Sequence, residues 1–313
     1  MPASFDGNDG NDGNSANAGG AGNSTSMSQG WFFADRVNLP FVTEPDQAPL
    51  TANPGKMIGA LPIINMSRFP DRNWSSEWYA WLVLNEFVVA TPLDTIDPHN
   101  HVNWPNWIPW PASDANWQVL NGSAQVQDEI NWLVTAAAEE RADALGEVLS
   151  QSDEFISYFL NLMTARPAAY PKTTRVLAMT SLIGTSVAMY FKGAYQRPRP
   201  SQLCPALLPP IEVPGHASFP SGHSTQSHLL ALIMQKVLQG LPQGATMFDD
   251  LWTLADVIAR NREIAGLHYR SDTEAGIAIA TTVSEMLPGL GVDTDQPTSL
   301  FQRSLREARA EWQ

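Results

Sequence analysis

Apolar side chains recur every three or four positions along most of the chain after residue 72, which is the period of an amphipathic helix. The first such stretch, residues 73–90, has N-cap candidates at Asn73 and Ser75 and must end before Pro92. Further stretches with this period are residues 125–149, 154–163, 173–194, 224–238, 246–265, 273–287 and 303–312. No stretch of comparable length alternates at period two. The pattern therefore predicts an all-α helical bundle with its sites between helices.

The helical pattern is absent from the N-terminal part. Residues 1–30 are mostly Gly, Asn, Ser, Ala and Asp, a composition with little to bury, and we expect a disordered tail there. Residues 31–72 are rich in Pro and Gly and are expected to wrap the surface in extended pieces. We therefore expect a tail followed by one all-helical catalytic domain over residues 31–313.

An aromatic, proline-rich segment at residues 94–111 is predicted to be a long loop. One interpretation is that its tryptophans pack it onto the domain or onto a second subunit. The alternatives are a hydrophobic rim over a site, or a metal site formed by one aspartate and two histidines. The residues concerned are Trp104, Trp107 and Trp110, and Asp97, His99 and His101.

Composition and charge limit the partners. The formal net charge of −14, from 32 acidic and 18 basic side chains, would repel nucleic acid and anionic membrane surfaces. The longest apolar windows, residues 78–89 and 176–191, are interrupted by polar side chains and fall short of the roughly 18 apolar residues that cross a bilayer. The single cysteine, Cys204, and the lack of a visible signal peptide fit a reducing compartment. We expect a soluble, cytoplasmic protein without membrane or nucleic-acid partners.

The segment FKGAYQRPRP carries the first of three motifs. Six residues separate Lys192 from Arg199, and no acidic side chain occurs from Lys192 to Ile211. Two Arg-Pro pairs stop the helix and hold the arginines on a stiff, extended segment. Arginine offers a fork of donors to a tetrahedral oxyanion, and lysine adds a point charge. The segment therefore indicates an anion site, with a solvated basic loop as the alternative.

The second motif is PGHASFPSGHS, residues 214–224. Ser221 is a natural cap for the helix that follows, whose unpaired N–H groups and dipole attract anions. Gly222 permits an oxyanion to approach the backbone closely. His223 is then placed to exchange a proton with the bound group. The alternative is a capped helix with an incidental histidine.

The third motif is NREIAGLHYRSD. Gly266 lets a helix end, so His268 is expected in the connection between helices. The sequence SDTE, residues 271–274, is interpreted as a capping box at the next helix start. Asp272, four residues after His268, would orient or balance a basic group, and Arg262 would add a second guanidinium to the anion site. The alternative is a salt-bridged surface turn.

The three motifs, K-x6-R-P, P-S-G-H and R-x5-H-x3-D, resemble in this order the signature of one superfamily. It joins type-2 phosphatidic acid phosphatases, bacterial class A acid phosphatases and vanadium-dependent haloperoxidases. The resemblance implies a helical bundle in which His268 is the axial partner of a bound oxyanion and His223 is the acid-base residue. Asn261 departs from the pattern, which usually has serine before the arginine. The oxyanion-binding residues implied by motif position are Lys192, Arg199, Ser221, Gly222 and Arg262.

Two chemistries share this site because five-coordinate vanadate has the geometry of the phosphoryl-transfer transition state. In a phosphatase, His268 would attack phosphorus and His223 would protonate the leaving alcohol. In a haloperoxidase, His268 would be the ligand of the metal in a vanadate cofactor, whose site phosphate can also occupy. Hydrogen peroxide and a halide would then yield hypohalous acid for an organic acceptor.

His216 favours the second chemistry, because HASFPSGH resembles bromide-oxidising haloperoxidases that carry a histidine seven residues before the acid-base one. We therefore expect a vanadate-dependent haloperoxidase, with bromide or iodide favoured and His216 tuning catalysis. The alternative is a soluble acid phosphatase that acts through a phosphohistidine. Met189, where related haloperoxidases carry tryptophan, leaves the halide open.

Other interpretations carry less weight. A non-catalytic phosphate-binding or scaffold protein would not need the pair His223 and His268. His228 faces away from His223 by the helical period and is interpreted as structural. Cys204 is interpreted as a small buried side chain, because no partner base is evident. Surface tryptophans and the aromatic loop hint at a homodimer.

Overall fold

A computed structural model describes residues 69–110, 116–289 and 299–313. These residues form helices and loops without a β-strand, which confirms the all-α prediction for the described part of the chain. The expected tail and most of the expected extended segment lie outside these ranges.

The described residues fall into two units. Those from Ser76 onward belong to one compact unit, and residues 69–75 belong to a second. The second unit contains the 3₁₀ helix η4 (Asp71–Asn73). The helices described below all belong to the first unit.

The helices predicted from the periodic pattern are present. They are α2 (Ser76–Ala90), α6 (Ile156–Leu162), α7 (Pro171–Tyr195), α9 (Gly222–Leu238), α10 (Gly244–Ile264), α11 (Arg270–Met286) and α12 (Leu300–Ala310). The chain also forms short elements with too few residues to show a period. They are α3 (Trp117–Leu120), α8 (Pro200–Leu203), η5 (Leu93–Thr95), η7 (Pro205–Leu207) and η8 (Leu287–Gly289).

One predicted helix is divided. Residues 125–149 lie in α4 (Ala124–Glu139) and α5 (Arg141–Asp153), which meet at a bend at Glu140. After the bend, the Arg141 guanidinium donates to the carbonyl oxygens of Ile264 at 2.9 Å and Leu207 at 2.8 Å. The Arg141 side chain at the start of α5 therefore caps the C-terminal end of α10.

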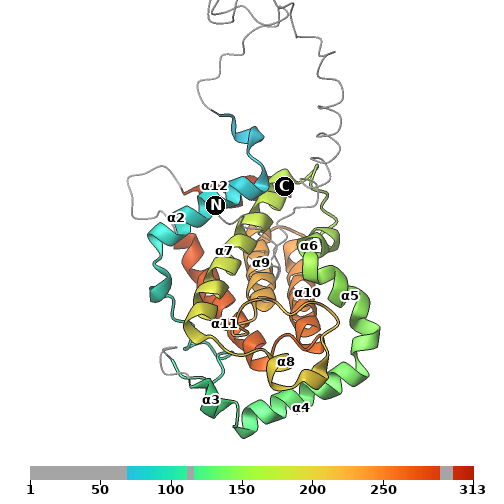
Figure 1. Cartoon of the computed structure of the whole chain (residues 1–313). Coiled ribbons are helices and arrows are strands. Elements are labelled where there is room, and N and C mark those ends of the chain that lie inside the picture. The colour runs from blue at the N-terminus through green and yellow to red at the C-terminus, as the bar shows by residue number, and fades with distance from the viewer. Residues whose placement is uncertain (1–68, 111–115, 290–298) are drawn as a thin grey trace, which may run out of the picture. The chain divides into compact units, whose positions relative to one another are not determined.

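Helix α9 lies at the centre of the bundle, against α7, α10 and α11 (Figure 1). Nearly all its side chains are buried, as expected of a central helix. Its second half contributes apolar core residues such as Leu230, Ile233 and Met234. Its first two turns are polar yet equally buried, with His223, Gln226 and His228 at most 1 % exposed. Buried polar groups require partners, so this end of α9 is where a site can form.

Helix α11 approaches the start of α9 very closely at Gly276. A Cβ atom built there would lie 2.8 Å from the Ser224 side chain and 3.0 Å from the Ser221 carbonyl oxygen. Glycine therefore permits this packing distance.

The aromatic loop packs onto the domain, as the first interpretation predicts. Trp104 is buried, and its ring meets those of Phe219 and Trp110 edge-on at 5.4 Å. The metal interpretation finds no support in the described residues, where no cluster of His, Cys, Asp or Glu could hold an ion. His99 instead hydrogen-bonds to Asp97 and stacks on Trp110.

The cytoplasmic assignment is contradicted, and so is the expectation that no segment could cross a membrane. The helical stretch Pro171–Leu203 is long and apolar enough to do so by length and composition, and 72 % of its apolar window is buried. Thr185, one of the hydroxyl residues that interrupt the apolar run, donates to the carbonyl oxygen of Ser181 at 3.1 Å, a bond that lets a hydroxyl sit in apolar surroundings.

Candidate active site

The start of α9 forms as predicted. The helix begins at Gly222, and the Ser221 hydroxyl accepts a hydrogen bond from the Ser224 N–H at 3.3 Å. The N–H groups of Gly222 and His223 belong to the first turn, which no carbonyl of the helix itself can reach. Together with the helix dipole they favour an anion at this end.

The basic segment is buried, so the solvated-loop alternative is wrong. Lys192, in the last turn of α7, is 2 % exposed and donates from Nζ to the carbonyl oxygens of Ala217 at 2.9 Å and Ser218 at 3.1 Å. The helix ends at Tyr195, and Gln196 then adopts a left-handed conformation with φ 51°. The Arg-Pro pairs follow as an irregular segment, as predicted.

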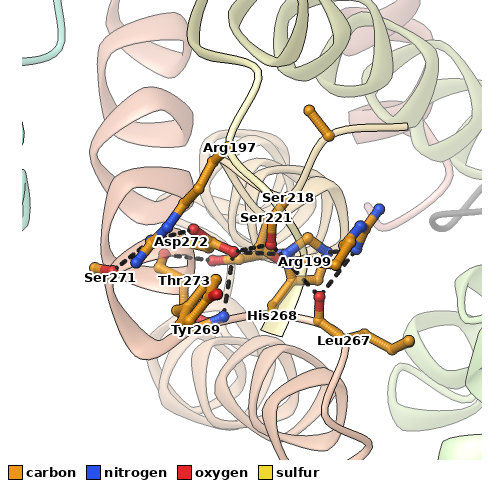
Figure 2. Close-up of polar contacts among 12 residues, drawn as sticks. Arg197, Arg199, Ser218, Ser221, Leu267, His268, Tyr269, Ser271, Asp272 and Thr273 are labelled. Carbon is orange, nitrogen blue, oxygen red and sulfur yellow. Dashed lines mark hydrogen bonds and ion pairs between the residues drawn. The ribbon is translucent and has the colours of Figure 1, made fainter. Parts of the chain in front are cut away.

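Arg199 lies at the centre of the site and is 2 % exposed. Its guanidinium donates to the carbonyl oxygens of His216 and Leu267, both at 3.0 Å. It also contacts two imidazoles. One is His268, whose Nε2 lies 3.0 Å away (Figure 2), and the other is His216, whose Nδ1 lies 3.1 Å away. The structure therefore brings the first and third motifs into direct contact.

His268 lies in the connection between α10 and α11, as predicted. Gly266 has φ 78°, and its N–H donates to the Glu263 carbonyl oxygen at 2.7 Å, which closes the end of α10. His268 and Asp272 are fully buried, so the surface-turn alternative is wrong.

The partners of His268 define its tautomer. Its Nδ1 lies 3.1 Å from Asp272 Oδ2, and its Nε2 lies 3.0 Å from an Arg199 nitrogen that can only donate. Nε2 must therefore accept, and Nδ1 carries the hydrogen shared with the carboxylate. The imidazole presents the lone pair of Nε2 to the Arg199 guanidinium.

The Asp272 carboxylate accepts hydrogen bonds from several donors. Besides His268, its Oδ2 accepts from the Ser218 hydroxyl and the Tyr269 N–H (Figure 2). Helix α11 begins at Arg270, so Asp272 caps it and the predicted cap at Ser271 is wrong. Burial raises the pKa of Asp272, but the Arg197 charge and the hydrogen bonds outweigh burial and leave the pKa below its usual range.

His223 and Arg262 lie together against α5. Arg262 is fully buried and donates to the carbonyl oxygen of Val148 at 2.7 Å, and His223 Nε2 lies 3.0 Å from that of Gln151. The two carbonyl groups are three residues apart, so one turn of α5 holds both side chains. Asn261, where the sequence departs from the pattern, donates to the Gln151 side chain at 2.8 Å and thereby fixes the same turn.

The start of α9 connects these two groups of residues. The Ser221 N–H donates to the Asp272 carbonyl oxygen at 3.0 Å, while His223, two positions later, contacts α5. Direct or shared contacts join six of the sequence-predicted residues, namely Lys192, Arg199, His216, Ser221, His268 and Asp272. His223 and Arg262 form a second group against α5, and Gly222 lies between Ser221 and His223 in the first turn of α9.

Several residues of the site escaped sequence reasoning. Arg197 binds Asp272 at 2.6 Å, Ser218 donates to Asp272, and Gln151 accepts from His223. Arg197 stands in the conspicuous RPRP segment, which is a signal that could have singled it out. Gln151 and Glu129, which binds Arg197, occupy ordinary polar helix positions without any such signal.

A cavity of about 830 Å³ lies beside Arg199 and is lined by Arg199, His216 and Ala217 among others. Within the described chain, none of its lining residues carries a carboxylate. Such a wall suits an anionic ligand.

His228 and Cys204, the two residues interpreted as structural, have contacts typical of structural residues. His228 contacts the Ser224 carbonyl oxygen at 2.8 Å and Asp256 at 3.0 Å, away from His223. Cys204 is partly buried against an apolar cluster that includes Leu207.

Comparisons with known proteins match the part of the chain that carries the three motifs. Residues 174–288 match the PAP2 superfamily. Decaprenylphosphoryl-5-phosphoribose phosphatase from two strains of Mycobacterium tuberculosis, CDC 1551 / Oshkosh and H37Rv, is 29 % identical over 146 residues, which are 46 % of this chain and 77 % of that protein. The crystal structure of a transmembrane PAP2-type phosphatidylglycerolphosphate phosphatase from Bacillus subtilis is 16 % identical. The structural match covers 57 % of this chain and 92 % of that chain, with a TM-score of 0.43. The findings support a PAP2 superfamily domain here.

These relatives contradict the expectation of a vanadate-dependent haloperoxidase, since the proteins named are phosphatases and not oxidoreductases. The expectation rested on His216. Its Nδ1 lies 3.1 Å from Arg199, a contact that is compatible with either chemistry.

Proposed function

We propose that this protein is a phosphatase of the PAP2 type that hydrolyses phosphate monoesters through a phosphohistidine at His268. One geometric observation carries the proposal: the buried His268 ring donates from Nδ1 to Asp272 and directs the lone pair of Nε2 at Arg199. A nucleophile oriented by a carboxylate beside an oxyanion-binding group is the arrangement that covalent phosphoryl transfer needs. The names of the relatives support the same reaction class.

In the first step, Nε2 of His268 attacks phosphorus and the bond from phosphorus to the alcohol oxygen breaks. Asp272 stabilises the positive charge that develops on the imidazole. Arg199 is 3.0 Å from Nε2, so it can bind an oxygen of a phosphoryl group attached there. Lys192, Arg262 and the amide of Gly222 would neutralise the remaining phosphoryl oxygens.

His223 is the acid-base residue of the proposal. Its Nε2 contacts a carbonyl oxygen, which only accepts, so Nε2 carries a hydrogen and Nδ1 is the nitrogen that exchanges a proton with the substrate. In the first step it protonates the departing alkoxide. In the second it takes a proton from the water that attacks phosphorus, and the bond from phosphorus to Nε2 breaks. The products are the alcohol and inorganic phosphate.

The substrate class follows from the relatives and the cavity. One relative is named for a polyprenyl-linked sugar phosphate, and the cavity at Arg199 is free of carboxylates in its described lining. We propose phosphate monoesters carried by a lipid or long-chain alcohol as the substrates to test first.

The purified full chain is incubated with nitrophenyl phosphate, glycerol phosphate and a long-chain alkyl phosphate in detergent micelles, and phosphate release is measured. Orthovanadate, a mimic of the transition state, should inhibit release. Alkaline quenching should trap an alkali-stable, acid-labile phosphoryl group on the protein, located on His268 by mass spectrometry. His268→Ala should lower turnover by about three orders of magnitude or more and abolish the trapped group.

Phosphate release by His268→Ala at the wild-type rate would overturn the nucleophile assignment. Absence of phosphate release from all three substrates by the wild type would overturn the proposed function itself.

A further inference from the structure

Arg197 is a fully buried arginine that the three motifs do not assign to the oxyanion. Its guanidinium lies 3.7 Å from the ring centre of Tyr269 and 4.9 Å from that of Trp117. Its Nη1 donates to Asp272 Oδ1 at 2.6 Å and to the Ser271 hydroxyl at 2.7 Å. Aromatic rings and acceptors therefore fix the guanidinium.

The two oxygens of Asp272 have different tasks. Oδ1 binds Arg197, and Oδ2 binds His268 Nδ1 together with Ser218 and the Tyr269 N–H. Figure 2 shows Asp272 with Arg197 on one side and Ser218 on the other. A carboxylate held by one oxygen cannot rotate about its axis without breaking this contact. The bond to Arg197 therefore keeps the other oxygen aligned with the imidazole.

Glu129 of α4 holds the outer end of this chain of contacts. Its carboxylate accepts from Arg197 Nη2 at 3.1 Å, from the Ser271 N–H at 2.6 Å and from the Ser271 hydroxyl at 2.8 Å. Ser271 lies in the first turn of α11, the helix that carries Asp272. The Glu129 carboxylate, which belongs to another helix, therefore caps α11. It also supplies a second negative charge for the buried guanidinium.

We infer that Arg197 and Glu129 are positioning residues for His268, acting through Asp272 and without contact to the substrate. The contacts form one continuous path of Glu129, Arg197, Asp272 and His268, in which the two carboxylates alternate with the guanidinium and the imidazole. The inference rests on the proposed function, because the purpose of the path is to orient Nε2 for attack on phosphorus.

Three variants test the path: Arg197→Gln, Arg197→Lys and Glu129→Gln. The measurements are kcat and KM for nitrophenyl phosphate, the rate at which the phosphohistidine forms in a single turnover, and the inhibition constant of orthovanadate. Because the residues act on the nucleophile and not on the anion, Arg197→Gln should lower kcat and the phosphorylation rate about 10–100-fold. KM and the orthovanadate constant should stay within about twofold of the wild type. Arg197→Lys should restore part of the rate, and Glu129→Gln should lower it by less than Arg197→Gln does.

A matched control lies elsewhere in the same fold. Arg260 stacks on Trp132 at 3.8 Å and pairs with Glu140 at 2.5 Å, which are the same two kinds of contact in a partly exposed position. Arg260→Gln and Glu140→Gln should leave kcat and KM unchanged. Thermal unfolding of every variant identifies one that fails to fold, and Glu129→Gln, which keeps the size of the side chain, then carries the test.

Wild-type kcat in a folded Arg197→Gln or Glu129→Gln protein would overturn the inference for that residue. A loss of turnover expressed in KM and orthovanadate affinity, with the phosphorylation rate preserved, would overturn it as well. Either result is distinct from failure of the proposed function, which shows as inactivity of the wild type.

Discussion

The backbone N–H of Ser221 donates to the carbonyl oxygen of Asp272 at 3.0 Å. This bond joins the residue that caps the N-terminal end of α9 to the residue whose carboxylate contacts the imidazole of His268. The Ser218 hydroxyl adds a second link from the same loop to the Asp272 carboxylate. The groups proposed to bind the phosphoryl oxygens and the group proposed to attack phosphorus are thus parts of one hydrogen-bonded unit.

Replacement of His223 by alanine should separate attack on phosphorus from protonation of the leaving group. Nitrophenolate leaves without a proton, so His223→Ala should still form the phosphohistidine from nitrophenyl phosphate at a rate within about tenfold of the wild type. With an alkyl phosphate, which needs the proton, formation should slow by about 10²–10⁴-fold. Rapid-quench measurements on both substrates check this, and equal losses on the two would contradict the assignment.

Replacement of Asp272 by asparagine should change how stability responds to acid. Burial raises the pKa of Asp272, but Arg197 and its hydrogen bonds outweigh burial, so the folded pKa lies below the unfolded value. Such a group stabilises the fold above its unfolded pKa, and this contribution is lost as pH falls through that value toward the folded one. Asp272→Asn should therefore be less stable at pH 7 and lose less on acidification. Urea unfolding between pH 7 and pH 3.5 measures both effects, and wild-type acid sensitivity in the variant would contradict the prediction.

Glu263 should have the opposite pH dependence. Burial raises the pKa of its carboxyl to about 7, from 4.5. The folded state then binds the proton more tightly than the unfolded state, so stability is lost as pH rises through this range, by up to roughly 3 kcal/mol. Glu263→Gln should remove this loss and be more stable than the wild type at pH 8. Unfolding free energies at pH 5 and pH 8 decide the point, and parallel profiles would disprove it.

Gly276 and Gly146 form a matched pair of helix glycines. A Cβ at Gly276 would overlap Ser224 and crowd the Ser221 carbonyl, so Gly276→Ala should cost about 1–3 kcal/mol of stability and lower kcat. At Gly146, in α5, a Cβ meets nothing within 4 Å, so alanine there should add about 0.5–1 kcal/mol. Thermal unfolding and turnover of the two variants measure the contrast. A neutral Gly276→Ala would show that α11 can move away from α9.

The helices were predictable because their apolar periodicity is a local property. α7, α9 and α10 begin and end close to the predicted positions, since proline, serine and glycine signals mark their ends. The bend at Glu140 was not predictable, because the helical pattern continues through it and the contact that follows it, between Arg141 and Ile264, joins positions 123 residues apart.

The site was predictable as far as its motifs extend. Lys192, Arg199 and His268 could be placed together because two of the three short patterns carry them. The bond between Arg197 and Glu129 joins positions 68 residues apart, and nothing in either local sequence predicts that the two side chains meet. The reaction class was misjudged at His216, whose contact with Arg199 is visible only in three dimensions.

His223 and Arg262 both contact α5 through carbonyl oxygens and not through its side chains. Both acceptors therefore belong to the backbone, and the Gln151 side chain adds the contact with Asn261 that fixes this turn. A single-residue insertion or deletion earlier in α5 would rotate both acceptors by about 100° around the helix axis. The proposed proton donor thus depends on an unaltered residue count within this outer helix (Figure 1).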